Sequence, residues 1–278
     1  MREVIRKADI AYINLETPLS DEGRWIGLFR TPTKFVEGLK WAGIDVVSTA
    51  NNHSLDAEGV GLVDTLETLK KAEIGAVGTG RNLEEARHPF VINKKGIKTA
   101  FFGYSQFKGW GYSKGFALTD RSGVVPLDPF LIKKDIARIR DKVDWIVLSF
   151  HWETEDEQKT HPAAREFAKK AIDAGADIII GHHPHVPHGV EVYKGKVIFY
   201  SLGNFIFKHN YTRWMDNILA RIYLASDKII KVEILPISGR GEHLHQPYLL
   251  KGEAAKKLLH NISILSGKLG LSASNILH

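Results

Sequence analysis

Short apolar runs that end directly in clusters of metal-binding side chains are the feature of this sequence that most limits its fold. Four such runs end in Asn, Glu or His residues. Runs of this length, bounded by turn residues, are typical of buried strands. Ligand sites in α/β folds gather beyond the carboxyl ends of parallel strands, so the pattern predicts that the clusters meet at one sheet edge. The clusters are Asn14-Leu15-Glu16 after 10–13, Asn51-Asn52-His53 after 45–48, His151 after 145–150, and Gly181-His182-His183-Pro184-His185 after 178–180.

The rest of the chain continues the alternation of strands and helices, which predicts an α/β fold with mixed sheets. Several segments have amphipathic helical spacing, and other apolar segments flank short turns as paired strands. With no low-complexity linker, we expect one domain over 1–278, and not a doubly wound nucleotide fold. The expected helices are 35–42, 60–72, 130–143, 163–174 and 254–264, and the expected strand pairs are 90–93 with 97–104, 190–193 with 197–200, and 218–224 with 229–235.

Composition excludes several classes of function. The 278 residues include no cysteine, which excludes a disulfide framework, a thiolate metal site and a cysteine nucleophile. A net charge of +6 favours an anionic partner. No basic run is interleaved with aromatics, so we expect no nucleic-acid partner. No stretch reaches the roughly 18 apolar residues of a membrane helix, so the sequence reads as soluble. Localisation stays open between the cytoplasm and, if a native N-terminal anchor is missing, the outer side of the cell membrane.

His183-Pro184-His185 is the most specific of the four clusters. Two imidazoles at positions i and i+2 can point to the same side of an irregular turn, and a following proline predicts an extended conformation for His183. We expect both imidazoles to bind metal. The alternative is a polar surface turn.

Glu16, Asn52 and His151 are the other expected metal ligands. The alternatives are a helix-start carboxylate for Glu16, an Asx-turn for Asn52 and a core histidine for His151. Carboxylate and amide oxygens combined with imidazole nitrogens suit Mn, Fe or Zn. Two such ions about 3.5–4 Å apart would polarise a phosphoryl or acyl group and generate hydroxide near neutral pH. The expected cofactor is therefore a divalent transition metal, as two ions.

His53 and Asp56 are the expected catalytic pair. The imidazole of His53 would act as general acid or hold substrate, and Asp56 would hydrogen-bond it and set its protonation state. The alternative is that Asp56, like Ser54, caps the following helix.

Four further residues are expected around the site as substrate-binding groups. Arg30 would contact an anionic substrate, or else be a surface cation. Glu155 would orient a ligand or bind substrate. His182 is either a neighbour of the ligands or a core residue, and Asn204 either shapes the rim or is an ordinary turn asparagine.

The motifs, in this order, resemble the CapA-like family of poly-γ-glutamate biosynthesis proteins, within the calcineurin-like metallophosphoesterase superfamily. The matching stretches are ADIAYINLETPLS, GIDVVSTANNHSLDAEG, SFHWETE and AGADIIIGHHPHVPHGVEVYKGKVIFYSLGNFIF. The resemblance implies a four-layer α/β/β/α sandwich of the metallophosphoesterase type with mixed sheets and a two-metal site. It assigns metal positions to Glu16, Asn52, His151, His183 and His185, and assigns His53 to the leaving group.

Two departures from the family pattern concern the site. The family normally opens with a strand ending in Gly-Asp, which supplies the first metal carboxylate, and no such element precedes Asn14. Because even the loss of a group beside the ligands costs about 10–100-fold in affinity, we expect either one tight and one weak metal position or an incomplete active site. Glu153 also stands where the family often has glycine after His-Trp.

Two functions follow as hypotheses. The first is metal-dependent hydrolysis or transfer at a phosphoester or amide, in the handling of poly-γ-glutamate for a capsule. The second is a non-catalytic, metal-stabilised module that binds an anionic polymer or assembles with a membrane-associated synthase or exporter. An intact His53 favours the first, and the absent Gly-Asp element favours the second.

Overall fold

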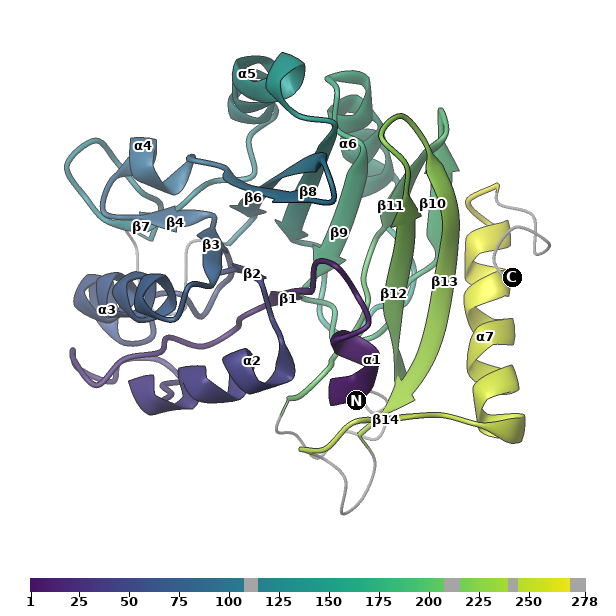
Figure 1. Cartoon of the computed structure of the whole chain (residues 1–278), viewed down its shortest axis with the longest axis horizontal. Coiled ribbons are helices and arrows are strands. Elements are labelled where there is room, and N and C mark those ends of the chain that lie inside the picture. The colour runs from purple at the N-terminus through teal and green to yellow at the C-terminus, as the bar shows by residue number, and fades with distance from the viewer. Residues whose placement is uncertain (108–114, 208–215, 240–244, 271–278) are drawn as a thin grey trace. The chain divides into compact units, whose positions relative to one another are not determined.

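The computed structural model describes residues 1–107, 115–207, 216–239 and 245–270 of the chain (Figure 1). The chain divides into two compact units, an N-terminal unit of residues 2–151 and a C-terminal unit of residues 152–278 with Met1. Each unit contains both helices and strands, so the predicted mixed α/β class is confirmed. The expectation that the whole chain forms one domain stays a prediction.

The first sheet of the N-terminal unit consists of three short parallel strands in the order β1-β2-β3. Val46 and Val47 of the central strand are completely buried. Val47 packs in one apolar cluster with Val36, Ile44 and Leu69. The elements are β1 (Tyr12–Asn14), β2 (Val46–Ser48) and β3 (Gly75–Val77), with α1 (Arg2–Ile5), η1 (Thr33–Phe35), α2 (Val36–Ala42) and α3 (Glu58–Lys71).

Three longer strands of the same unit run in the order β8-β6-β5. The middle strand is parallel to β8 and antiparallel to β5, so this part of the sheet is mixed, and Ser105 lies opposite His151 in the register. Every residue of β8 is buried, as its continuous apolar run predicts. The elements are β5 (Phe90–Lys94), β6 (Ile97–Ser105) and β8 (Trp145–His151), with β4 (Thr79–Gly80), α4 (Leu83–Ala86), β7 (Gly123–Val124), α5 (Pro129–Ile139) and η2 (Arg140–Lys142).

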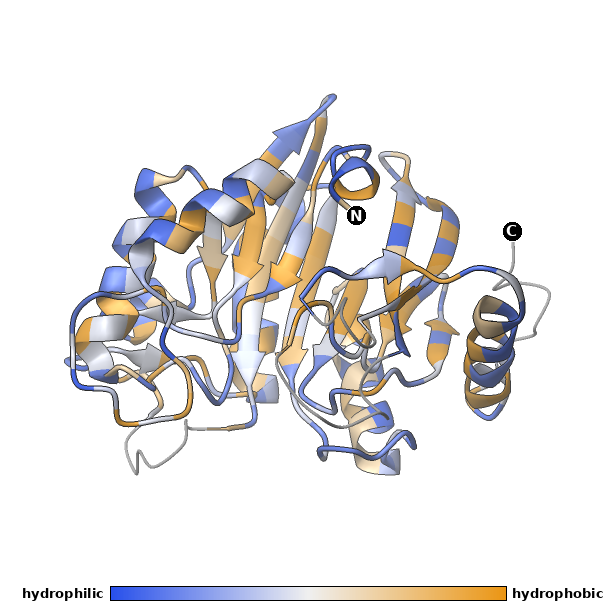
Figure 2. Ribbon diagram, turned by 90° about the horizontal axis from the view of Figure 1, so that it is seen from below, coloured by the Kyte–Doolittle hydropathy of each residue, from blue (hydrophilic) through white to orange (hydrophobic). Residues whose placement is uncertain are grey.

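The C-terminal unit contains the second set of strands. β11 is parallel to β9 and antiparallel to β10, and the long strands β12 and β13 pair antiparallel. Figure 2 shows apolar residues concentrated along the strands, and alternating polar and apolar residues around the helix next to the C-terminus. The elements are α6 (Pro162–Asp173), β9 (Ile178–His182), β10 (Val190–Tyr193), β11 (Lys196–Phe199), β12 (Asp216–Leu224), β13 (Ile229–Ser238), β14 (Tyr248–Leu249) and α7 (Gly252–Gly267).

The predicted elements are confirmed, with small shifts at their ends. Both predicted hairpins at Lys-Gly turns are present, and the helices expected at 60–72 and 163–174 begin and end within two residues of those bounds. The helix expected over 130–143 ends earlier, because α5 gives way to a 3-10 turn at Arg140. None of the helices in the described part of the chain has the length and apolar character that a membrane crossing requires.

Close packing fixes the end of β9, where the histidine cluster begins. The rings of Trp152 and Tyr200 stack with centroids 5.9 Å apart, and Nε1 of Trp152 donates to the carbonyl of Tyr200 at 3.0 Å. Gly181 lies against this pair. A Cβ at Gly181 would overlap the Tyr200 carbonyl and would lie 2.6 Å from Trp152 Nε1. The space at residue 181 therefore admits only glycine.

We expect Gly181→Ala to lower the free energy of unfolding by about 1–3 kcal/mol, because overpacking of a tight core displaces backbone. Gly38→Ala is the matched control. A Cβ at Gly38, in α2, meets nothing within 4 Å, and alanine in a helix is favoured over glycine by about 0.5–1 kcal/mol. Urea unfolding measures both, and equal stability of the two variants would contradict this account of the packing.

Candidate metal and proton-transfer site

The carboxylate of Glu16 is held by an asparagine relay at the ends of two parallel strands. Asn14 and Ser48 are partners in the register of β1 and β2, so the segments after them leave the same sheet edge. Nδ2 of Asn51 donates to the carbonyl of Leu15 at 2.8 Å and to Oδ1 of Asn14 at 3.3 Å. Nδ2 of Asn14 in turn donates to Oε2 of Glu16 at 2.9 Å. The two asparagines thus hold one oxygen of the Glu16 carboxylate at the ends of the two strands.

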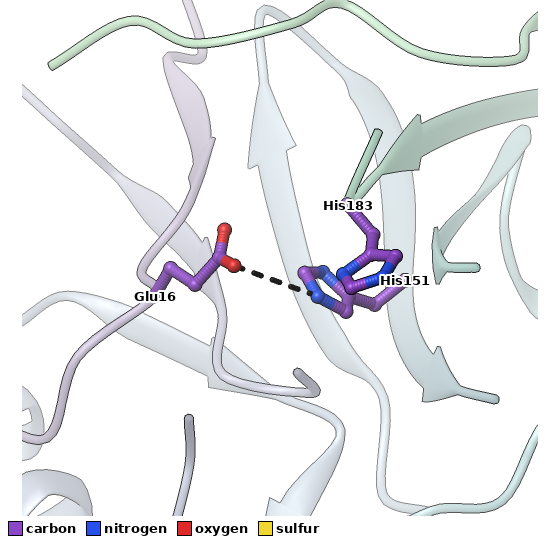
Figure 3. A group of neighbouring side chains, drawn as sticks. All are labelled: Glu16, His151 and His183. Atoms are coloured by element: carbon purple, nitrogen blue, oxygen red, sulfur yellow. Dashed lines mark ion pairs between the residues drawn. The ribbon is translucent and has the colours of Figure 1, made fainter. Parts of the chain in front are cut away.

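Three expected ligands of the N-terminal unit come together as the sequence predicts. Nε2 of His151 lies 2.8 Å from Oδ1 of Asn52 and 3.6 Å from Oε1 of Glu16. The ion pair between Glu16 and His151 is drawn as a dashed line in Figure 3. His151 is completely buried, Asn52 is buried and the Glu16 side chain is 12% exposed. The cluster therefore lies at a largely desolvated position.

These donor atoms fit a metal ion. Neighbouring ligands on an ion with bonds of about 2.1 Å lie about 3.0–3.4 Å apart, close to the two separations around His151 Nε2. An amide oxygen only accepts, so Nε2 of His151 carries the proton in its bond to Asn52. Binding a cation at Nε2 requires the other tautomer of the imidazole, with the proton on Nδ1.

His53 and Asp56 form the pair that the sequence predicts. Nδ1 of His53 lies 2.7 Å from Oδ2 of Asp56, whose side chain is completely buried. The same oxygen accepts hydrogen bonds from the backbone N–H groups of Leu28 and Phe29, both at 2.8 Å. A carboxylate bonded to Nδ1 fixes the tautomer of an imidazole, so Nε2 of His53 is left as the nitrogen that can meet a substrate.

The alternative of a helix cap by Ser54 or Asp56 is wrong. α3 begins after Ala57 without a side-chain cap. Oγ of Ser54 donates instead to the carbonyl of Asn51 at 2.7 Å, which closes the turn that carries Asn52 and His53. Both polar side chains therefore shape the loop before the helix.

The histidine cluster of the C-terminal unit has an unusual backbone. His183 has φ 100° and His185 has φ 61°, a region that side chains other than glycine rarely adopt. The extended conformation expected for His183 is therefore wrong, although a proline follows it. Strained residues of this kind persist where the surrounding structure holds them, often at functional sites. The two rings lie with centroids 6.2 Å apart.

Each of these two imidazoles has a polar neighbour that the sequence singles out. Nδ1 of His185 lies 2.9 Å from Oδ1 of Asn204. Because an amide oxygen only accepts, this bond places the proton on Nδ1 and leaves Nε2 free of it, the state of a metal-binding histidine. Oε1 of Glu155 lies 4.0 Å from Nε2 of His183, and the Glu155 side chain is 49% exposed. Asn204 and Glu155 thus border the two candidate ligands.

His182 and Arg30 have structural partners. His182 is buried, and its burial lowers the pKa of the imidazole to about 3. Its backbone carbonyl accepts from the N–H of Trp152 at 3.1 Å. The Arg30 guanidinium donates to the carbonyls of Ser20, Asp21 and Gly23 at 3.0, 2.6 and 2.9 Å. Substrate contact by either residue stays a prediction.

Glu153, which stands in place of a family glycine, adopts a conformation that suits glycine. Its φ is 70°. Its carboxylate accepts from the backbone N–H of His161 at 3.3 Å. Burial raises the pKa of this carboxyl to about 7. Glu153 therefore adopts a left-handed backbone conformation that a glycine would adopt without strain.

His188 is a buried residue that the search for polar side chains at strand ends does not identify. Nε2 donates to the carbonyl of Glu157, and Nδ1 lies 3.3 Å from Oγ1 of Thr160. His188 thus ties the segment after Glu155 to the segment after His185. Its position follows no apolar run, and only the density of histidines in 182–188 marks it.

Comparison with known proteins places these motifs in a family. The profile of the bacterial capsule synthesis protein PGA_cap family matches residues 1–209. The chain belongs to this family. The CapA-like resemblance carried by the four motifs is thereby confirmed.

Two relatives of this PGA_cap chain carry the CapA name. The chain is 33% identical over 240 residues to the PGA biosynthesis protein CapA of Bacillus subtilis, covering 84% of this chain and 62% of that protein. It is 34% identical over 207 residues to the capsule biosynthesis protein CapA of Bacillus anthracis, covering 73% of this chain and 50% of that protein. The chain thus spans only part of the length of both relatives.

A solved structure of a hypothetical protein from Thermus thermophilus has a similar fold. It matches 90% of either chain with a TM-score of 0.53 and 15% sequence identity. At that identity the similarity shows the fold alone. Within the described part of the N-terminal unit of this PGA_cap chain, Glu16 and His151 are candidate metal-binding side chains.

We expect His151→Ala to weaken Mn²⁺ binding by at least about 100-fold, because loss of a ligand should exceed the 10–100-fold cost of losing its supporting partner. Asn204→Ala, which removes only the hydrogen-bond partner of His185, should weaken Mn²⁺ binding by about 10–100-fold. Isothermal titration and elemental analysis measure both. His260→Ala is the control, since His260 is exposed on α7. Equal affinity in all three variants would remove these residues from a metal site.

Buried His188 should make stability depend on pH. Burial lowers its pKa from 6.5 to about 4. The unfolded chain therefore binds a proton more readily, and the contribution of the neutral imidazole, on the order of 3 kcal/mol, is present above about pH 6.5 and lost as pH falls through 4. His188→Gln keeps a donor and an acceptor but does not titrate. Urea unfolding between pH 7 and 4 should show a shallower loss in this variant, and an unchanged slope would refute the assignment.

Proposed function

We propose that this chain is a metal-dependent hydrolase-type module of capsule and poly-γ-glutamate biosynthesis that acts on a phosphoester or an amide. The observation that carries the proposal is the buried pair of His53 and Asp56 beside the ligand cluster of Asn52, His151 and Glu16. A purely structural metal site has no need of an oriented imidazole next to its ligands. The names of the CapA relatives supply the biological setting.

The proposed metal centre combines ligands from both units. The N-terminal unit provides a carboxylate, an amide oxygen and an imidazole, and the C-terminal unit provides the imidazoles of His183 and His185. These five residues, from four strand ends, would hold the divalent ions, which would supply Lewis-acid chemistry. Mn, Fe and Zn all accept this mixture of oxygen and nitrogen donors. The convergence of the two sets is part of the proposal.

His53 acts in this scheme as the proton donor to the leaving group. Protonated at both nitrogens, its ring donates from Nδ1 to Asp56 and from Nε2 to the leaving oxygen or nitrogen. The carboxylate of Asp56 stabilises the imidazolium and is itself held by two backbone N–H groups. When bound, the metal would polarise the substrate and activate water. The chain's own contribution is the orientation and supply of the proton.

The substrate in this proposal is anionic. The net charge of +6 raises the local concentration of anions such as phosphoesters or poly-γ-glutamate. A phosphoryl group or a glutamyl amide presents an oxygen that a divalent cation can polarise.

We expect the Mn²⁺-loaded protein to hydrolyse an aryl phosphomonoester or diester, and His53→Asn to lower kcat by about 10²–10⁴ while metal content is unchanged. Asp56→Asn should lower kcat as well, because the amide no longer stabilises the imidazolium. His260→Asn, on the exposed face of α7, serves as the control. A wild-type rate at background with full metal occupancy would sink the enzyme proposal.

A second candidate function is a non-catalytic module that binds the polymer or a membrane-associated synthase or exporter. The basic charge and the biosynthetic names of the relatives favour it. Binding of poly-γ-glutamate that is unaffected by His53→Asn, in a protein without hydrolytic activity, would select this function over the first.

A further inference from the structure

One loop of the N-terminal unit is fixed to Asp56 by four consecutive backbone amides. The N–H groups of Ile26 and Gly27 donate to the Asp56 carbonyl at 2.9 and 3.1 Å. Those of Leu28 and Phe29 donate to its Oδ2 at 2.8 Å. A loop held by four hydrogen bonds to one buried residue has a defined conformation. We call residues 25–29 the clamped loop.

The same residue orients His53, so the clamped loop and the proposed proton donor share one support. Oδ2 of Asp56 accepts from the loop and from His53. The ring of Phe29 packs edge-on against the His53 ring, with centroids 4.4 Å apart. A Cβ at Gly27 would overlap the Asp56 carboxylate, so the backbone there approaches as closely as it can. The clamped loop is thereby placed directly beside His53.

The clamped loop presents large apolar side chains to solvent. Trp25 is 65% exposed, Ile26 40% and Leu28 56%. Arg24, the residue before them, is engaged in an ion pair with Glu58 at 2.7 Å. Contiguous exposed apolar patches on a folded protein can mark binding sites. Because the backbone is fixed, these side chains are presented in advance of any ligand.

We propose that the clamped loop binds the leaving-group side of the substrate and selects leaving groups with an apolar or aromatic portion. The inference rests on the proposed function, because it takes His53 as the group that protonates the leaving atom. Whatever His53 protonates must lie next to Phe29 of the clamped loop. The indole of Trp25, four residues earlier in this loop, is exposed and offers a flat apolar surface suited to a planar or aliphatic group.

Steady-state kinetics test the selection. Trp25→Ala in the Mn²⁺-loaded protein should lower kcat/KM for 1-naphthyl phosphate by about five- to tenfold, mostly through KM, because it removes binding that ground state and transition state share. For ethyl phosphate the change should be within about twofold. Trp41→Ala is the matched control, since Trp41 is 61% exposed on α2. Equal losses for both substrates, or the same discrimination in Trp41→Ala, would overturn the proposal.

A binding measurement keeps this test separate from hydrolysis. 4-Nitrobenzylphosphonate, which cannot be hydrolysed, should quench tryptophan emission in the wild type and to a smaller extent in Trp25→Phe. Quenching that depends on Trp25 in a protein without activity would support the loop contact and reject the hydrolase. Hydrolytic activity without quenching that depends on Trp25 would support the hydrolase and reject the loop contact. If Trp25→Ala instead reduced binding to phosphatidylglycerol vesicles and left both readouts unchanged, the loop would be a membrane contact and the proposal would fail.

Discussion

The buried carboxylate of Asp56 is the group on which the organisation of the N-terminal site depends. It is completely inaccessible to solvent and accepts hydrogen bonds from two backbone amides and one imidazole. Burial of a carboxylate is costly unless hydrogen bonds compensate it, and here each compensating bond also has a structural effect. The amides fix the loop 26–29, and the imidazole is that of His53. The buried carboxylate of Asp56 thus fixes both the conformation of the loop 26–29 and the orientation of the His53 ring.

The sequence predicts the part of the site that depends on strand ends. Glu16, Asn52 and His151 each follow an apolar run, and parallel pairing of β1 with β2 and of β6 with β8 brings such ends to common edges. The pairing of His53 with Asp56 is also predictable, because three residues of a tight turn separate them. Local spacing and hydrophobic pattern carry this information.

Other parts of the site depend on contacts that sequence patterns do not encode. The clamped loop lies on Asp56 across about thirty positions of sequence, and nothing in the apolar pattern of 25–29 predicts that its amides bind a carboxylate. The positive φ of His183 contradicts the usual effect of a following proline. Tertiary packing around Gly181, Trp152 and Tyr200 holds the chain immediately before it. The sequence pattern does not identify His188 either, because its hydrogen bonds join two loops that only the tertiary structure brings together.

The charges around Glu16 argue for a cation at this site. A carboxylate and the imidazole of His151 lie 3.6 Å apart in a region where the imidazole is completely buried. Protonation of that imidazole would compensate the carboxylate, but it carries the desolvation cost of a second buried charge. A divalent ion compensates the carboxylate while it binds the neutral ring through a lone pair, and Oδ1 of Asn52 at 2.8 Å supplies a further donor. The same three side chains are therefore better satisfied around a metal than around a proton.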